Sequence, residues 1–586
     1  MKKTFLLILF ILKSTLIFAV NYYVDKVKGN DANNGLTLST PWKTIQKAAL
    51  TAQAGSTIFI KAGTYNENII VTNSGTAGNP IVFRNFNTDL VYIDGTGTSK
   101  ADGTALIKVY DASYLEFRNL ILQNLLCPNA TGFIVLNSPS IGITDIKVVN
   151  LTIHDIKWTP LSTTQPTSSL ENAHPFVVNG SGTTQETAIT NITVEECKIY
   201  NNVTGYSESL THNGNVDGFS VINNSVRDNS NIGIDVAGNY GQSAVPSLDH
   251  ARNGIIKNNK IYNNINPNSS SAGIYIDGGW NITVEKNESF NNSLGIEIGC
   301  EKNGTTENIV VKNNIFYNNL NCGIYLGGYN LNTTGQVKNA TIRNNSFFQN
   351  DTNNGGNGEI QITKATNCKI ENNIFYATNQ KIILSYAKGL NPNPSNTFDY
   401  NCWFTPNNDS NDLKIVVPPN TIYTNFFSYV SATKQDVHSF YSSPNIANNI
   451  LTSLNMSLNS KSPCINSGNK STAISPNETD FLGSNRILGS IDIGAIESQI
   501  PLGIAPFYNE NETQLFPNPV SDFFHIESKK GIQNIRVYSE MGVLVLNIDH
   551  PLTIETLDVS NLSSGVYILK VNYEDEISSN HKIIKN

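Results

Sequence analysis

Residues 310–326 read VVKNNIFYNNLNCGIYL. Three short apolar runs are separated by asparagine-rich breaks, and the last run, Gly323-Ile324-Tyr325-Leu326, alternates between apolar and polar positions. Alternation with a period of two indicates β-strands, and Asn and Gly readily adopt the left-handed backbone of tight turns. The segment therefore predicts short strands joined by tight turns rather than a helix.

The same pattern recurs through the middle of the chain. Its units end in an asparagine at Asn224, Asn259, Asn287, Asn314, Asn345 and Asn373, with steps of 35, 28, 27, 31 and 28 residues. A unit this small cannot bury its own apolar side and must stack on its neighbours. The Leu-x-x-Leu framework of leucine-rich repeats is absent, and a propeller blade needs roughly 40–50 residues. The prediction is an all-β solenoid of the parallel β-helix type.

Composition agrees with a turn-rich solenoid. Among 586 residues there are about 85 asparagines, about three times ordinary usage. The net charge is -8, which argues against a nucleic-acid partner because such binding needs a basic face. Seven scattered cysteines contain no CxxC pair, which disfavours zinc or thiol redox chemistry and leaves disulfide pairing open.

Residues 41–52 predict one short amphipathic helix that covers the open first coil.

The two ends of the chain predict export. Residues 1–19 combine a basic start with a short apolar run, as a secretory signal peptide does. Residues 514–586 resemble the C-terminal sorting domain of the type IX secretion system of Bacteroidota, from the opening Pro517-Asn518-Pro519 to the run LSSGVYILKV. The resemblance implies a small β-sandwich, a secreted or surface-attached protein, and the secretion machinery as a partner. Residues 498–513 are then a linker.

Residues 20–497 resemble secreted right-handed parallel β-helix proteins, many of which are polysaccharide lyases or glycoside hydrolases. The resemblance rests on Tyr22-Tyr23-Val24 and Pro41-Trp42-Lys43 near the start, and on Ser462-Pro463-Cys464 and Asp492-Ile493-Gly494 near the end. It implies a right-handed β-helix, with the predicted helix as its N-terminal cap. It also implies that the protein is a monomer and that its partner is an extracellular polysaccharide or oligosaccharide.

Candidate catalytic residues follow from stacking the Gly-Ile-x-Ile strands. The two apolar residues face the core, so the residues at x form one outward row about 4.8 Å apart per coil. That row reads Asp235, Tyr275, Glu297, Tyr325 and Gln361. Asp277 also faces outward, and Glu301 follows at the turn. We therefore expect Asp235, Asp277, Glu297 and Glu301 to share one patch without a basic residue in the row.

Crowded carboxylates raise one another's pKa, and glycosidic cleavage needs one protonated and one ionised carboxyl. Carboxylates on neighbouring coils suit a retaining enzyme and those on alternate coils an inverting one, so both outcomes stay open. The stretch Leu294–Glu301 also resembles the acid/base strand of β-helical xylosidases, with Glu301 at the acid position. This hydrolase reading needs no cofactor.

Aromatic and polar side chains are expected to bind the sugar around these carboxylates. Tyr275, Tyr325 and Trp280 offer flat faces for sugar rings. Long insertions at 154–189, 201–215 and 239–253 are expected to build a groove and to contribute His212, Asp217 and Arg252 as further ligands. The coil register through 201–220 stays open.

Two alternatives remain. A polysaccharide lyase would act by β-elimination on uronic acids and would use Ca²⁺. Calcium-dependent lyases that resemble this chain carry a lysine in a GFKLGG-like strand, where Gly323–Gly328 has Tyr325, which counts against that mechanism. The other alternative is a non-catalytic glycan binder or adhesin.

Overall fold

The computed structural model describes residues 19–168, 170–387, 395–499, 513–540, 542–549, 554–574 and 578–586. The chain divides into two compact units, one through Gln499 and one from Ile500. The predicted signal peptide lies outside the described residues except for Ala19, and so does most of the predicted linker. No helix in the described segments is long and apolar enough to cross a membrane.

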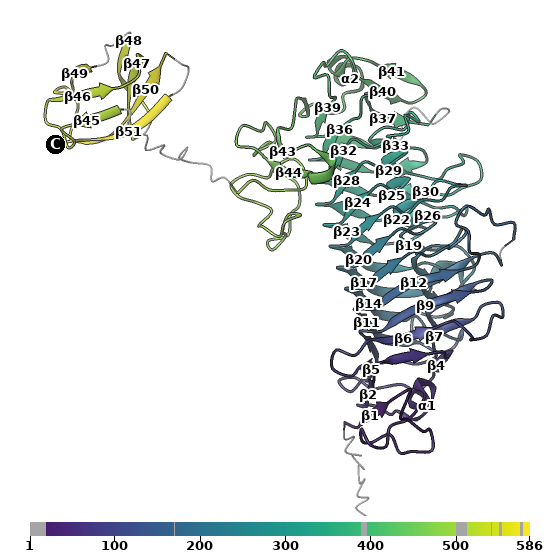
Figure 1. Ribbon diagram of the computed structural model, residues 1–586. Helices are drawn as coiled ribbons and strands as arrows, with labels where there is room; N and C mark the ends of the chain where they lie inside the picture. Colours follow the sequence, from purple (N-terminus) through teal and green to yellow (C-terminus); the bar gives the residue numbers. More distant parts are fainter. Residues whose placement is uncertain are drawn as a thin grey trace, which may run out of the picture. The chain divides into compact units, whose positions relative to one another are not determined.

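Three 13-stranded sheets, here called sheets A, B and C, form the first unit as a parallel β-helix (Figure 1). Each coil from β2 to β40 contributes one strand to each sheet. Sheet A contains β1 (Asn21–Val24), β2 (Thr57–Ile60), β5 (Ile81–Asn85), β8 (Leu115–Arg118), β11 (Ile143–Val149), β14 (Ile189–Glu195), β17 (Val216–Ile222), β20 (Arg252–Lys257), β23 (Thr283–Glu285), β27 (Val310–Lys312), β31 (Thr341–Arg343), β35 (Lys369–Glu371) and β38 (Thr397–Asp399).

Sheets B and C complete each coil, and only the last strand pair of sheet C, β40 with β41, is antiparallel among the pairs of these three sheets. Sheet B contains β3 (Gly63–Tyr65), β6 (Val91–Asp94), β9 (Ile121–Leu126), β12 (Thr152–Lys157), β15 (Lys198–Tyr200), β18 (Ser225–Arg227), β21 (Lys260–Tyr262), β24 (Glu288–Phe290), β28 (Ile315–Tyr317), β32 (Ser346–Phe348), β36 (Ile374–Tyr376), β39 (Cys402–Phe404) and β42 (Phe440–Tyr441). Sheet C contains β4 (Ile69–Val71), β7 (Ala105–Tyr110), β10 (Ala130–Leu136), β13 (Ala173–Gly180), β16 (Leu210–Gly214), β19 (Ile234–Ala237), β22 (Ala272–Asp277), β25 (Leu294–Gly299), β29 (Cys322–Leu326), β33 (Ile360–Ile362), β37 (Ile382–Tyr386), β40 (Lys414–Val417) and β41 (Thr421–Tyr423).

Smaller elements decorate the coils. The predicted capping helix is α1 (Ile45–Thr51), which buries Ile45, Ala48 and Ala49, and Thr44 accepts a hydrogen bond from the Lys47 N–H at its start. A second helix, α2 (Phe426–Thr433), lies near the other end of the solenoid (Figure 1). The rest are β26 (Thr305–Glu307), β30 (Gln336–Lys338) and β34 (Ala365–Thr366) in one small sheet, β43 (Ile446–Asn448) and β44 (Asn455–Leu458) in another, and two 3₁₀ turns at Pro246–Leu248 and Leu451–Ser453.

Stacked side chains of one kind hold successive coils together. Phe316, Phe347, Phe375 and Trp403 form one buried ring stack, with centroids 5.1, 4.9 and 4.4 Å apart. The recurring asparagines of the repeat form a buried ladder in which the side-chain amide of each bonds to the next. Beyond Asn373 the ladder continues to Asn401, whose amide donates to the Asp436 carboxylate. The ladder accounts for part of the high asparagine content.

The segment after the last coil folds back onto the solenoid. Its apolar residues, among them Met456, Cys464 and Ile493, cover outward-facing side chains of β28, β32, β36 and β39. All seven cysteines of the chain are buried and unpaired.

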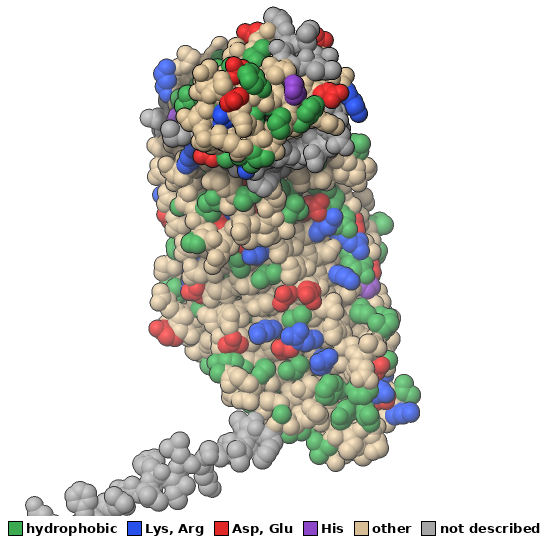
Figure 2. All heavy atoms as spheres, turned by 90° about the vertical axis from the view of Figure 1, so that its left-hand side faces the viewer, with side chains coloured by type: hydrophobic (Ala, Val, Ile, Leu, Met, Phe, Trp, Pro, Cys, Tyr) green, Lys and Arg blue, Asp and Glu red, His purple; other side chains and the backbone are tan. Residues whose placement is uncertain are grey.

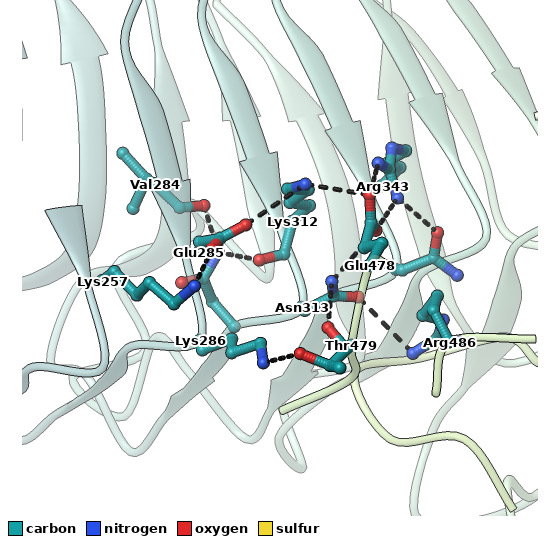
Figure 3. Close-up of polar contacts among 12 residues, drawn as sticks. Lys257, Val284, Glu285, Lys286, Lys312, Asn313, Arg343, Glu478, Thr479 and Arg486 are labelled. Carbon is teal, nitrogen blue, oxygen red and sulfur yellow. Dashed lines mark hydrogen bonds and ion pairs between the residues drawn. The ribbon is translucent and has the colours of Figure 1, made fainter. Parts of the chain in front are cut away.

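Glu478 fastens this returning segment to sheet A. Figure 3 shows its carboxylate between the side chains of Lys312 and Arg343, which come from β27 and β31. Arg343 donates two hydrogen bonds of 2.7 Å, and the Lys312 ammonium lies 2.9 Å away. Burial raises the pKa of Glu478, but Arg343 and Lys312 outweigh burial and lower that pKa to about 2.

Glu478→Gln is expected to destabilise the protein by about 3 kcal/mol, because it leaves the buried Arg343 without its counterion, while Lys312 keeps only its ion pair with Glu285. Thermal unfolding followed by circular dichroism measures the effect, with Glu186→Gln at an exposed glutamate as the matched control. Since the folded-state pKa lies below the ordinary value of 4.5, this stabilisation is present above about pH 4.5 and is lost as the pH falls towards about 2. Equal unfolding temperatures for the two variants would contradict this role.

The second unit is a small antiparallel β-structure around one apolar core that includes Phe524, Val537 and Leu569. The predicted strands near 523, 535 and 566 are present. One sheet holds β45 (Thr513–Phe516), β46 (Phe523–Ser528) and β49 (Ile554–Asp558), and the other holds β48 (Leu544–Asp549), β47 (Ile532–Ser539), β50 (Gly565–Tyr573) and β51 (Ser578–Lys585).

Candidate active site

A cavity of about 880 Å³ lies against sheet C and is lined by every residue of the predicted row from Asp235 to Gln361. Strands β13 to β33 of sheet C supply its wall, and loops between the strands supply its rim. The lining residues include His174, Tyr206, Glu208, Thr211, Asp235, Tyr240, Tyr275, Asp277, Leu294, Glu297, Glu301, Tyr325, Tyr329 and Gln361. They contain five carboxyl groups and no Lys or Arg.

The strand register produces this row as the sequence predicted. Asp235 aligns with Tyr275, Tyr275 with Glu297, Glu297 with Tyr325, and Tyr325 with Gln361. The flanking aliphatic residues face the core, so the intervening side chains face the cavity. The environment differs from the open surface that we expected, because Asp235 and Tyr275 are each only 3% exposed.

Asp277 and Glu301 lie next to each other beneath Tyr240. The Tyr240 hydroxyl donates a hydrogen bond to Asp277 Oδ2 and lies 3.1 Å from Glu301 Oε2. The Glu301 backbone N–H donates to the other Asp277 oxygen at 2.6 Å. Both oxygens of Asp277 therefore accept hydrogen bonds. Asp277 ends β22, and Glu301 follows the neighbouring strand β25, which brings two residues 24 positions apart into contact.

Burial and mutual repulsion shift the carboxyl groups towards their protonated forms. Burial, followed by the charge of Glu301, raises the pKa of Asp277 to about 8. Burial raises the pKa of Glu297 well above its usual value. Asp235 shifts in the same direction through burial and the charges of Glu208 and Asp277, and burial raises the pKa of Glu208 to about 7. The cavity therefore holds several protons at neutral pH.

The cavity differs in charge from one outer face of the molecule. Figure 2 shows the face of the molecule on the left-hand side of Figure 1, where basic and acidic side chains are interspersed. Inside the cavity, by contrast, none of the lining residues can neutralise the carboxylates with a positive charge, since burial lowers the pKa of His174 to about 4. A bound anion would meet only groups that are neutral or negative.

Two of the predicted sugar ligands, His212 and Trp280, lie elsewhere. His212 pairs in register with Val236 rather than with Asp235, so its ring points into the core, where it stacks on Phe219 at 4.4 Å and is fully buried. Trp280 follows the Gly278-Gly279 turn out of sheet C, stacks on His250 at 3.8 Å and donates to the Thr305 carbonyl. Neither side chain lines the cavity.

Asp217 and Arg252 are also absent from the lining. They lie on adjacent strands of sheet A, β17 and β20, and form an ion pair at 3.0 Å. The strand Val216–Ile222 thus belongs to sheet A and Leu210–Gly214 to sheet C, which settles the register that the sequence left open. Tyr275 and Tyr325, by contrast, do line the cavity.

The insertions contribute residues that sequence reasoning missed. Glu208 comes from the insertion before β16 and accepts a hydrogen bond of 3.1 Å from the Thr211 hydroxyl. Tyr240 comes from the insertion after β19. The available signal was the length of these insertions, which predicted a groove but did not say which side chain enters it.

Within the described segments, no group of three or more His, Cys, Asp or Glu side chains is arranged to hold a metal ion. Ca²⁺ stays a prediction of the lyase alternative.

Comparison with known proteins identifies the family. YwoF of Bacillus subtilis (strain 168), an uncharacterized protein, is 32% identical over 438 residues, which cover 72% of this chain and 88% of YwoF. The chain belongs to the YwoF family. Residues 247–353 of this YwoF relative match the right handed beta helix region, and residues 514–586 match the secretion system C-terminal sorting domain. The second unit is thus a sorting domain, which indicates a secreted or surface protein and implies contact with secretion machinery.

The other similarities of this YwoF family member are either shorter or lower in sequence identity. Pectate lyase PEL9 of Emericella nidulans is 37% identical over 121 residues, 18% of this chain and 29% of PEL9. Among solved structures, pectate lyase Pel9A is 15% identical with a TM-score of 0.43, covering 82% of this chain and 96% of Pel9A. The GH136 lacto-N-biosidase from Eubacterium ramulus is 16% identical with a TM-score of 0.44, covering 63% and 66% of the two chains.

Proposed function

We propose that the protein is a secreted carbohydrate-active enzyme, a glycoside hydrolase in which Asp277 and Glu301 cleave a glycosidic bond with retention of configuration. The observation that carries the proposal is the shared contact of both carboxylates with Tyr240. Since each hydrogen bond spans about 3 Å, the two carboxylate oxygens lie within about 6 Å of each other. Retaining enzymes place their carboxyl groups roughly 5–5.5 Å apart, and inverting enzymes roughly 6.5–9.5 Å.

The two carboxyl groups receive different roles from their surroundings. Asp277 accepts hydrogen bonds on both oxygens, from Tyr240 and from the Glu301 N–H, and these donors stabilise its ionised form. Glu301 is the more exposed of the two. Burial and the charge of Glu301 outweigh these donors and raise the pKa of Asp277 to about 8, so we assign the proton of the pair to Asp277 and the negative charge to Glu301.

The reaction then follows in two balanced steps. Glu301 attacks the anomeric carbon while Asp277 gives its proton to the departing oxygen, which forms a glycosyl ester and releases an alcohol. Asp277 next takes a proton from water, the water oxygen attacks the same carbon, and the ester bond to Glu301 breaks. Tyr275 and Tyr325, which alternate with the carboxyl groups along the wall, offer apolar ring surface to the sugar.

The proposed acid predicts a basic limb in the pH profile. Since the pKa of Asp277 is raised to about 8, the pair keeps its proton below that pH and loses it above. We expect kcat/KM to fall about tenfold per pH unit above about pH 8. Initial rates from neutral to alkaline pH measure the limb, after incubation controls show that the enzyme survives each pH. A rate that rises through this range would contradict the assignment.

Tyr240→Phe is expected to lower kcat about 10–100-fold, because a hydrogen bond to a charged group contributes about 1.5–3 kcal/mol. Losing this donor also makes Asp277 harder to ionise, so the basic limb should move to higher pH. Tyr329→Phe, on the rim of the same cavity, is the matched control. An unchanged rate and limb in Tyr240→Phe would remove Tyr240 from the mechanism.

A polysaccharide lyase is the second candidate, favoured by the similarity of 121 residues to PEL9. Elimination from a uronic acid needs a base and a positive group that neutralises the substrate carboxylate. No Lys or Arg lines the cavity, and Tyr325 occupies the position where the lysine was expected. Both features support the hydrolase over the lyase.

One assay on the full chain separates these candidates from a pure glycan binder. The protein is incubated with a panel of neutral and acidic polysaccharides and oligosaccharides, with and without Ca²⁺. Reducing ends and the ultraviolet absorbance of unsaturated sugars are both followed. Hydrolysis raises reducing ends alone, elimination raises both signals, and binding alone raises neither. We expect the first result, abolished in Asp277→Asn; absorbance that grows with reducing ends would overturn the proposal.

A further inference from the structure

Three carboxyl groups of the cavity have no part in the proposed reaction. Glu208, Asp235 and Glu297 line the same space as Asp277 and Glu301. They come from three different parts of the chain: the insertion before β16, strand β19 and strand β25. Because they converge on one cavity, we looked for a function of these three carboxyl groups that is separate from the cleavage step.

One carboxyl oxygen of Asp235 in this wall lacks a hydrogen-bond partner. Its side chain is 3% exposed, and its Oδ1 atom is buried without a hydrogen-bond partner. Leaving a buried polar atom unpaired costs about 1–3 kcal/mol, so such an atom facing a cavity points to a ligand that completes the bond. The observation is independent of the number of acidic residues nearby.

We propose that Glu208, Asp235 and Glu297 act as protonated carboxyl groups that bind the hydroxyl groups of a short, uncharged oligosaccharide. This inference rests on the proposed hydrolase function and names its substrate class. A protonated carboxyl offers one O–H donor together with acceptor oxygens, whereas an ionised carboxylate only accepts. Sugar hydroxyls also donate and accept, so the neutral form is the better match.

The charges around Asp235 keep it protonated. The titratable groups that face it are Glu208 from the preceding insertion, Asp277 from β22, Glu301 after β25, and, through Asp277, the hydroxyl of Tyr240. No cation lines the cavity to offset the negative members of this set. Burial and these neighbours raise the pKa of Asp235, and burial raises that of Glu297 in the same way.

The shape of the wall suits a chain of a few sugar units. Along sheet C, Asp235, Tyr275, Glu297 and Tyr325 follow one another in consecutive coils about 4.8 Å apart. A sugar that lies across this wall meets a ring surface and a carboxyl group in alternation. The cavity volume of about 880 Å³ falls within the range of small-molecule sites.

The same wall excludes acidic sugars. A uronate carboxylate would enter a space where every ionised side chain is negative, and like charges placed together in a binding site cost enough to weaken binding at least about 100-fold. The substrates of the site should therefore be neutral oligosaccharides rather than pectate or alginate fragments.

Binding to the full-length Asp277→Asn variant tests the inference without turnover. Isothermal titration calorimetry compares neutral trisaccharides (xylotriose, cellotriose, galactotriose), trigalacturonate, trimannuronate and chitotriosan at about pH 6 and about pH 9. We expect at least one neutral trisaccharide to bind, the acidic ones to bind at least about 100-fold more weakly, and neutral binding to weaken about tenfold or more at the higher pH.

A second substitution at Asp235 separates hydrogen bonding from charge. Asp235→Asn keeps a donor and an acceptor, so it should retain neutral binding and lose part of the pH dependence, while Asp235→Ala should bind about tenfold more weakly. The inference is overturned if an acidic trisaccharide or chitotriosan binds best, if no neutral trisaccharide binds at millimolar concentration, or if Asn and Ala behave alike. If the unsubstituted protein binds a neutral trisaccharide but does not cleave it, the hydrolase proposal is contradicted while this inference still holds.

Discussion

Asp277→Asn and Glu301→Gln are each expected to abolish most of the activity while leaving the fold intact. Removing the proton donor should lower kcat/KM by about 10²–10⁴-fold, the usual contribution of a positioned acid or base. Removing the nucleophile should cost as much or more, because the covalent route is lost entirely. The measurement is steady-state kinetics on the substrate that the panel identifies. Glu307→Gln, outside the cavity on β26, is the matched control and should retain its rate.

Azide rescue distinguishes the two roles. In Asp277→Ala, azide should replace water in the second step and yield a glycosyl azide with retained configuration. In Glu301→Ala, azide should attack the sugar directly and yield the inverted product. The opposite pairing of variant and product would exchange the two roles, and full activity in either variant without azide would contradict the assignment.

Asn314→Ala is expected to have the largest effect on stability, a loss of about 3–5 kcal/mol. The side-chain amide of Asn314 donates to the carbonyls of Val284 and Lys312 and to Asn345 Oδ1, and its oxygen accepts from the backbone and side-chain amides of Asn287. Apart from Lys312, the residues that supply these groups are buried. Removal of the asparagine therefore leaves unpaired polar groups on three adjacent coils, each of which costs part of its desolvation energy.

Urea and thermal unfolding of the full chain, followed by circular dichroism, measure this loss. The matched control is Asn303→Ala, because Asn303 is an exposed asparagine of a loop. We expect the control to lie within about 0.5 kcal/mol of the unsubstituted protein, as surface substitutions usually do. An equally small change in Asn314→Ala would show that the ladder does not hold the coils together.

The sequence predicted the architecture because the repeat is local. The residues of each coil determine its turns, for example at Asn313-Asn314. They also determine its inward-facing side chains, such as Ile296 and Ile298. Parallel stacking then aligns equivalent positions without further information. For this reason the sequence alone predicts the row from Asp235 to Gln361.

The rest of the cavity depended on segments outside the repeat. Glu208 and Tyr240 enter it from insertions whose backbone path has no period, so their side chains could not be placed. His212 was misplaced because the register between 201 and 220 was open, and a shift of one residue turns a strand side chain from the cavity to the core. Trp280 was misplaced because the Gly278-Gly279 turn redirects the chain.

The contact between the returning segment and sheet A could not be predicted from the sequence either. Glu478 lies 135 residues beyond Arg343 in the sequence, and nothing near it indicates that it pairs with β27 and β31. The pairing joins residues far apart in the sequence, so only the assembled fold reveals it.

The configuration of the first-formed product tests the central claim most directly. On a substrate from the panel, ¹H NMR in the first moments of cleavage reports the anomer before mutarotation mixes the forms. Retained configuration is predicted, because Asp277 and Glu301 lie close enough to share Tyr240. An inverted first product would contradict the account, since it requires a water molecule between more widely spaced carboxylates.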